Sequence, residues 1–180
     1  MSGADLVIGS IRGFRWWKLD HEGWLLSPWR GRQRWLPGTN RARCLFRKRI
    51  TKWRASRKPH PLGSPARGCD CGFYGLHEVP PTEDHPARFG WEIGVESSGD
   101  RRHGLVFGIA AAEGRVLVGT DGWRAEVARP LALLWGHGIE LDGRAASNDH
   151  LYALPTYRDL SALVEEWGPG EVERELAEAA

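Results

Sequence analysis

The sequence predicts an α+β fold, a sheet-rich single domain with antiparallel strands and a C-terminal helix. Three observations lead to this prediction. The 180 residues include 23 glycines and 11 prolines, which indicates many turns between short elements. Apolar and charged residues alternate in the N-terminal part, as in half-buried strands, whereas apolar residues near the C-terminus have helical spacing. We expect one domain over 1–168 and an acidic tail over 169–180.

The stretch from Gly13 to Gly38 reads GFRWWKLDHEGWLLSPWRGRQRWLPG, in which DHEG and SPWRG interrupt the alternation as turns. Short antiparallel strands are expected here, among them Phe14–Leu19 and Trp24–Leu26. Large aromatic side chains are usually buried, so most tryptophans of this stretch are expected in the core of a small sheet. An aromatic stacking platform is the alternative. The tryptophans are Trp16, Trp17, Trp24, Trp29 and Trp35.

Residues 41–58 are the most basic stretch, with nine Lys and Arg and no acid. Phe46, Ile50 and Trp53 are spaced i, i+4 and i+7, which predicts a helix with one apolar stripe and cationic flanks. Prolines at positions 59 and 61 end this pattern.

Residues 79–90 have the composition of a surface linker. The segments WEIGVES, GLVFGIAAAEG and RVLVGTDGWRAEVARP then predict strands joined by turns, with a tight turn at TDGW. Residues 131–137 are apolar and predict a short helix or a buried strand. The segment PTYRDLSALVEEWGPG predicts a helix with Leu160, Leu163, Val164 and Trp167 on one face, ended by the Gly-Pro pair at 168–169.

The net charge of +2 conceals a strong asymmetry. Residues 1–68 have a balance of +13, and residues 69–180 have a balance of −11. This split indicates either a half that binds polyanions or two halves that attract each other. No signal peptide or membrane span is apparent, so we expect a cytoplasmic protein. In that reducing compartment the three cysteines are expected to be metal ligands or buried thiols.

A metal site is predicted from the order C-x15-H-x8-C-x-C, formed by Cys44, His60, Cys69 and Cys71. Three thiolates and one imidazole suit the tetrahedral preference of Zn2+, and four protein ligands describe a closed, structural site. Glycines at positions 68 and 72 allow the chain to fold around an ion. The fold prediction therefore includes a zinc-pinned loop region. The alternative is three small buried thiols.

Several short motifs carry a resemblance. They are G-x-R-x-W, GWLLSP and WLPG, a cysteine, HP, CDCGFYGL, GWRAEVARP and LPTYRDLSALVEEW. In this order they resemble a family of small uncharacterised proteins of high-GC, actinobacterial bacteria and their phages. The resemblance extends with gaps from Gly13 to Trp167, and CDCGFYGL and GWRAEVARP are its most specific parts. It implies a shared fold and the metal ligands Cys44, His60, Cys69 and Cys71, and it implies no activity.

The sequence departs from this family between the first cysteine and the histidine. Members of the family have a short connection there, whereas this chain has fifteen residues that include FRKRITKWRASRK. We interpret 41–58 as a basic insertion that projects from a loop pinned by the metal. The departure leaves His77 and His85 as alternatives to His60 for the fourth ligand.

The basic insertion predicts binding of DNA or RNA. Its cations would replace the counterions of phosphates, and its tryptophan would stack on an unpaired base. The residues proposed for this contact are Arg47, Lys48, Arg49, Lys52, Trp53, Arg54, Arg57 and Lys58. A solvated helix face opposite the acidic half is one alternative. Binding to a membrane surface through the apolar stripe is another.

The leading functional interpretation is a non-enzymatic, zinc-stabilised binding module. No HExxH motif, phosphate-binding glycine loop, nucleophile elbow or Cys-His pair is found. A small enzyme acting on a phosphorylated or nucleotide substrate is the alternative from another class, and it would need an open metal position and a pocket between the basic and acidic halves. A protein-interaction adaptor with exposed tryptophans as anchors is a third possibility.

Overall fold

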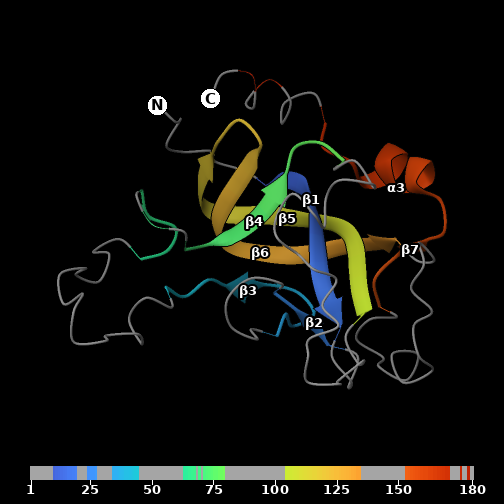
Figure 1. Ribbon diagram of the computed structural model, residues 1–180, viewed down its shortest axis with the longest axis horizontal. Helices are drawn as coiled ribbons and strands as arrows, with labels where there is room; N and C mark the ends of the chain where they lie inside the picture. The colour runs from blue at the N-terminus through green and yellow to red at the C-terminus, as the bar shows by residue number, and fades with distance from the viewer. Residues whose placement is uncertain are drawn as a thin grey trace, which may run out of the picture.

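The computed structural model describes residues 10–19, 24–27, 34–44, 63–67, 69, 71–79, 104–134, 153–170, 175 and 178. This part of the chain forms one seven-stranded sheet and one short helix (Figure 1). All pairings are antiparallel except that of the last strand. The predicted sheet-rich architecture with antiparallel strands is confirmed.

Four strands pair in a closed circuit. β1 (Ile11–Leu19) lies along β5 (Gly104–Val118), and β5 lies along β6 (Gly122–Leu134). The start of β6 pairs with β4 (Phe73–Leu76), whose last residue is opposite Phe14 of β1. The sheet therefore curls back on itself into a small barrel, and β5 and β6 are long enough to contribute to both of its sides.

The register between β5 and β6 shifts twice, between Ile109 and Ala110 and between Glu113 and Val116. The second shift contains Gly114 at φ 70°, a left-handed conformation that glycine adopts at low cost. The prediction of two strands separated by a turn at this glycine is wrong, because the glycine marks an irregularity within one continuous strand. The turn predicted at TDGW is confirmed, since the Gly119 amide donates to the Gly122 carbonyl at 2.8 Å.

Three two-residue strands extend the sheet. β2 (Leu25–Leu26) pairs with the end of β1, as predicted for a strand beginning near Trp24. β3 (Asn40–Arg41) pairs with the middle of β6, and β7 (Thr156–Tyr157) runs parallel to the end of β6. The Asn40 side chain ends the turn before β3, because its Oδ1 accepts from the Leu36 amide at 2.7 Å. Asn40 thereby sets where β3 begins.

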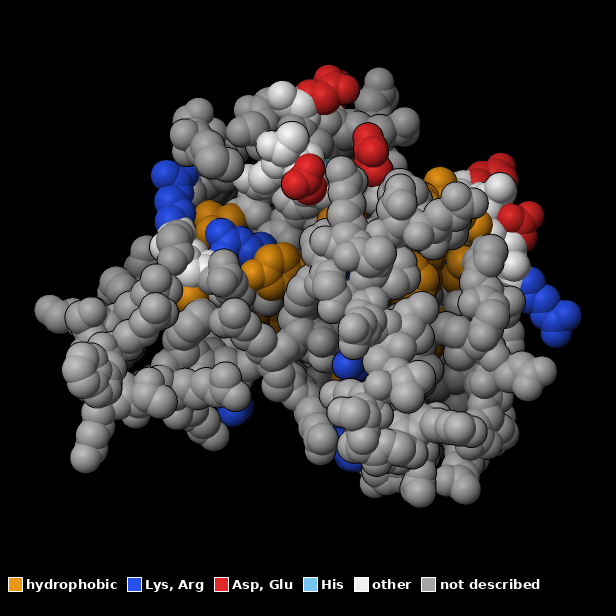
Figure 2. All heavy atoms as spheres, viewed as in Figure 1, with side chains coloured by type: hydrophobic (Ala, Val, Ile, Leu, Met, Phe, Trp, Pro, Cys, Tyr) orange, Lys and Arg blue, Asp and Glu red, His pale blue; other side chains and the backbone are white. Residues whose placement is uncertain are grey.

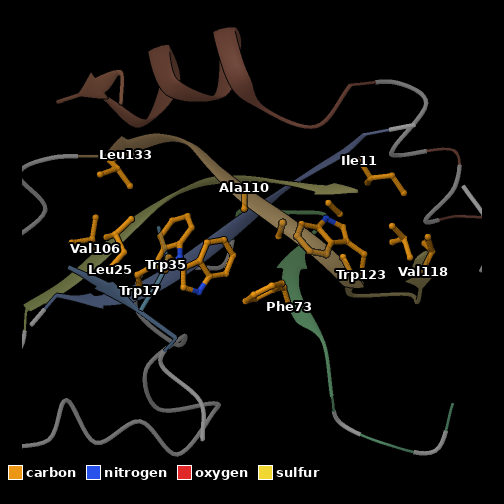
Figure 3. Packing of buried hydrophobic residues seen from close by; sticks show 14 residues of the cluster. Ile11, Trp17, Leu25, Trp35, Phe73, Val106, Ala110, Val118, Trp123 and Leu133 are labelled. Carbon is orange, nitrogen blue, oxygen red and sulfur yellow. The ribbon is translucent and has the colours of Figure 1, made fainter. Parts of the chain in front are cut away.

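The interior of the barrel is filled with aromatic rings from strands that are distant in sequence. Trp17 and Trp35 meet edge to face with ring centroids 5.4 Å apart, and Trp35 meets Phe73 at 4.6 Å. Trp123 lies toward Ile11 and Val118 (Figure 3). Burial of Trp17 and Trp35 agrees with the prediction that tryptophans of the first segment form a core. Trp16 and Trp24 are half-buried, and Trp29 is outside the described residues.

A second apolar layer lies between the barrel and α3 (Leu160–Trp167). Leu163 is fully buried against residues such as Phe14 and Ile109, as the helical spacing predicts. Asp159 caps the start of the helix, its carboxylate accepting from the Ser161 amide at 2.8 Å. Gly168 ends it, so the predicted C-terminal helix is confirmed.

Ala110, Ala111 and Ala112 of β5 lie between the two apolar layers and are fully buried. Their small side chains allow the strand to pass where both of its faces are covered.

Residues 131–134 belong to β6 and are buried, so the strand alternative holds for this part of 131–137. The predicted strand at WEIGVES, the linker at 79–90 beyond residue 79 and most of the tail at 169–180 lie outside the described residues. Among the residues described, no helix has the length and apolar character needed to cross a membrane.

Candidate metal centre

The three cysteines of the chain converge on one point. Cys44 follows β3, and Cys69 and Cys71 precede β4. Their Sγ atoms all lie within 4.8 Å of one another, and those of Cys44 and Cys69 are 3.9 Å apart. Cys69 and Cys71 are buried, and Cys44 is half-buried. None of the three forms a disulfide, so all three sulfurs remain available as ligands.

Strand β6 brings the cysteines together. β5 pairs along one edge of β6, so β3 and β4 share its other edge. On that edge Phe73 is opposite Ala125 and Arg41 is opposite Val127, which leaves Glu126 between the two strands. The chain departs after β3 at this junction and returns to it before β4. Cys44 and the pair Cys69 and Cys71 are therefore adjacent in space, although they are far apart in the sequence.

The segment before β4 is shaped by glycine and held by an arginine. Gly72 has φ +119°, and a Cβ there would lie 3.1 Å from Pro65 and 3.3 Å from the Ala125 carbonyl oxygen. Only glycine fits both this conformation and this space. The Arg124 guanidinium of β6 donates to the Cys69 carbonyl oxygen, and the Cys69 amide donates to the Ala66 carbonyl at 3.2 Å. These contacts fix the direction in which Cys69 and Cys71 point.

The sulfur geometry and chemistry fit a zinc ion. With a Zn–S bond of about 2.3 Å, two sulfurs of a tetrahedral site are about 3.8 Å apart. The 3.9 Å separation of the Cys44 and Cys69 sulfurs lies close to this value. Burial, together with the side-chain hydrogen bond to Cys71, raises the pKa of the Cys69 thiol. A metal that binds here therefore displaces the proton of Cys69, and a soft cation does so most effectively.

Among the described residues, no further His, Cys, Asp or Glu joins the three cysteines. His77 follows β4, and four extended residues place it about 13 Å along the strand from Phe73. Its Nε2 donates to the Gly119 carbonyl oxygen at 3.0 Å, and its amide donates to Asp121. His77 is thus occupied at the opposite end of β4. His60 and His85 lie outside the described residues, so ligation by either of them stays a prediction.

The residues predicted to contact nucleic acid also lie outside the described part of the chain. They are Arg47, Lys48, Arg49, Lys52, Trp53, Arg54, Arg57 and Lys58. Of the basic insertion 41–58, the structure describes residues 41–44. Arg41 forms an ion pair with Glu126 at 3.2 Å, which joins the basic half of the sequence to the acidic half. At this contact a cation of the basic half is therefore paired with a carboxylate of the acidic half.

A buried arginine was missed by sequence reasoning. Arg15 lies in the barrel interior, with its guanidinium 4.6 Å from the Trp35 ring centroid and 5.9 Å from that of Trp17. It donates to the Tyr74 carbonyl and to Ser27 Oγ, the latter at 3.2 Å. Burial lowers the pKa of the guanidinium to about 9, so the side chain is still a cation at neutral pH. The two tryptophan faces and the two oxygens stabilise that cation without a carboxylate among the described residues.

The two most specific motifs of the sequence form neighbouring strands. CDCGFYGL contains β4 and GWRAEVARP contains most of β6, and Gly75 is opposite Trp123 in their pairing. The Trp123 indole packs over Gly13 and Gly75, and its Nε1 donates to the Arg12 carbonyl at 3.2 Å. Gly13 and Arg15 belong to the G-x-R-x-W motif. These motifs therefore describe the barrel interior and the approach of the cysteines.

Comparison with models of protein families, with curated proteins and with solved structures gave no match. The resemblance of the motifs to the actinobacterial family accordingly stays a prediction.

Proposed function

We propose that the protein is a non-enzymatic binding module in which one structural Zn2+ holds the base of a basic segment that contacts nucleic acid. Cys44, Cys69 and Cys71 are the zinc ligands within the described residues, and His60 is the proposed fourth. The observation that carries the proposal is the convergence of three thiols at the junction of β3 and β4. The chain between those thiols is the most basic part of the sequence.

Several features support zinc as the ion. Three sulfurs within 4.8 Å of one another offer a soft donor set, and two of the cysteines are buried. A fourth ligand from the protein would close the coordination sphere, which is the arrangement of a structural site. When bound, the ion would link the end of β3 to the start of β4. The metal–sulfur bonds would then offset the entropy cost of closing the loop between these two strands.

The charge of the intervening segment supports nucleic acid as the partner. Residues 45–68 contain eight Lys and Arg and no acid, together with Trp53. Phosphates attract such a segment through counterion release, and an aromatic ring can stack on a base of a single strand. A metal at the base of the segment would hold its two ends together and reduce the entropy lost on binding.

A salt titration tests the nucleic-acid part of this proposal. We expect a labelled single-stranded DNA to bind at low salt, with the logarithm of the binding constant falling linearly against the logarithm of salt concentration. Replacing Lys52, Arg54, Arg57 and Lys58 with glutamine should reduce the slope by about 0.7 for each phosphate that the variant no longer neutralises. Fluorescence anisotropy measures both quantities. Absence of binding at low salt, or binding independent of salt, would rule out this function.

Proton release tests the ligand set separately. Cysteine binds zinc as a thiolate, and burial raises the pKa of Cys69 to about 11, so this thiol must lose its proton when the metal binds. Binding of Zn2+ by three thiolates should therefore release about three protons, and zinc affinity should fall as the pH is lowered. Titration with Zn2+ in a weakly buffered indicator solution counts the protons. Release of fewer than two protons would contradict ligation by all three cysteines.

A further inference from the structure

Four arginines lie on the segments that carry the cysteines or on the strands next to them. Arg43 precedes Cys44 and Arg67 lies two residues before Cys69, and both are exposed. Arg115 and Arg124 come from β5 and β6 and are half-buried. Arg124 reaches the centre directly through its hydrogen bond to the Cys69 carbonyl. We define the arginine face as these four residues: Arg43, Arg67, Arg115 and Arg124.

Strand alternation places Arg124 on the outer side of the barrel. Trp123 and Ala125, the residues on either side of it, are buried in the interior, so Arg124 points outward. Leu117 is opposite Arg124, and Arg115 lies two residues before Leu117 on β5, so the two arginines are near neighbours on adjacent strands. A Cβ on Gly63 would lie 3.7 Å from Arg115 Nη2, so the chain that leads to Cys69 passes beside Arg115.

The acids described in this region are already paired with other arginines. Glu126 forms its ion pair with Arg41, and Glu113 forms one with Arg129 at 2.9 Å. Figure 2 shows Lys and Arg side chains at the upper left, in the lower centre and at the right edge, and acidic side chains at the top and right. The carboxylates of Glu126 and Glu113 are thus paired with arginines outside the arginine face.

An arginine and a serine near Gly63 contain atoms without a hydrogen-bond partner among the described residues. Arg115 Nε and Nη2 and Ser64 Oγ are buried and have no hydrogen-bond partner within the described part of the chain. Ser64 follows Gly63, which packs next to Arg115. Buried guanidinium nitrogens and hydroxyls are usually satisfied by protein, water or an ion. Arg115 as a whole is half-buried, so part of the residue remains accessible beside these buried atoms.

We propose that the arginine face is a phosphate-binding surface of the folded domain, on which the exposed Arg43 and Arg67 contact phosphates of a bound nucleic acid and the accessible part of Arg115 adds its charge. This inference rests on the proposed function and extends the interface from the basic segment onto the barrel. Both segments that carry the cysteines also carry arginines of the face, so the metal centre positions these contacts. Arginine suits them because its planar fork binds two phosphate oxygens at once.

The experiment uses the full chain, zinc-loaded, with the same labelled single-stranded DNA. The variants are Arg43→Gln, Arg67→Gln and Arg115→Gln, singly and combined. Arg124 is left unchanged because it supports Cys69. Each single change should make the salt slope shallower by about 0.7, and the triple change by about 2. Arg158→Gln is the matched control, since Arg158 is an exposed arginine next to α3, away from the cysteines.

Zinc content and circular dichroism verify that each variant keeps its fold and its metal. A shallower slope in the Arg43, Arg67 and Arg115 variants, with an unchanged slope in Arg158→Gln, supports the phosphate surface. An unchanged slope in the triple variant overturns it and leaves the proposed function in place. An equal change of the salt slope in Arg158→Gln also overturns it, because the nucleic acid would then bind to arginines over the whole surface and not to this face. Absence of salt-dependent binding by the unmodified protein overturns the proposed function together with this inference.

Discussion

Replacing Cys69 with serine is expected to remove the bound zinc, about one ion per chain in the unmodified protein, and to destabilise the fold severely. Cys69 is buried, and its sulfur lies 3.9 Å from that of Cys44, so a serine there leaves two thiolates in place of three. Free zinc ten-thousand-fold above its dissociation constant stabilises the folded state by about 5 kcal/mol. That is a large part of the stability of an ordinary domain. Elemental analysis and thermal unfolding measure the two effects.

A chelator provides the control for this variant. The unmodified protein should lose the same stability when its metal is removed, whereas the Cys69→Ser protein should be insensitive to chelation. Cys69→Ala in the chelated background should cost little beyond the loss of a small buried side chain. If the purified protein contains no metal and its melting temperature does not change with chelator, the cysteines are buried thiols and the zinc proposal is wrong.

Replacing Gly75 with alanine is expected to cost about 3 kcal/mol of unfolding free energy. A Cβ on Gly75 would lie 2.9 Å from Trp123 Nε1, with two indole carbons closer still. The ring has little room to move, because Gly13 is in contact with it from β1 and Nε1 donates to the Arg12 carbonyl. The methyl group therefore forces either the indole or strand β4 out of place. Urea unfolding at constant pH measures the loss.

A second substitution distinguishes this steric effect from a general intolerance of β4. Trp123→Phe creates space beside Gly75, so the double variant should lose less stability than the sum of the two single variants. The expected coupling is about 1 to 3 kcal/mol. Gly119→Ala is the matched control, because a Cβ there would have only the Gly122 carbonyl oxygen nearby, at 3.5 Å. Additive losses from Gly75→Ala and Trp123→Phe would contradict the predicted clash.

Elements with strong local signals were predictable from the sequence. The alternation in FRWWKL predicted most of β1, and TDGW predicted the turn between β5 and β6. The spacing of Leu160, Leu163 and Trp167 predicted α3, together with its end at Gly168. These signals are local because the period of a strand or helix and the conformation of a turn depend on residues that are close in the chain.

Other features were not predictable because they depend on distant partners. Glycine is typical of turns, yet β5 pairs with β6 both before and after Gly114, so this glycine is an irregularity within one strand. Arginine is usually exposed at the protein surface, yet Trp17 and Trp35 pack against the guanidinium of Arg15. Burial of a charge is decided by what packs against it, and the rings around Arg15 come from two segments.

The sequence by itself determined which residues could be metal ligands, since thiol chemistry and the close spacing of Cys69 and Cys71 are local properties. It also determined that the segment between Cys44 and Cys69 is basic, with eight Lys and Arg and no acid over residues 45–68. Only the tertiary structure decided that Cys44 joins the other two cysteines and that His77 does not. The physical reason is the edge of β6, where β3 ends and β4 begins on either side of Glu126, so that two segments separated by a long loop meet.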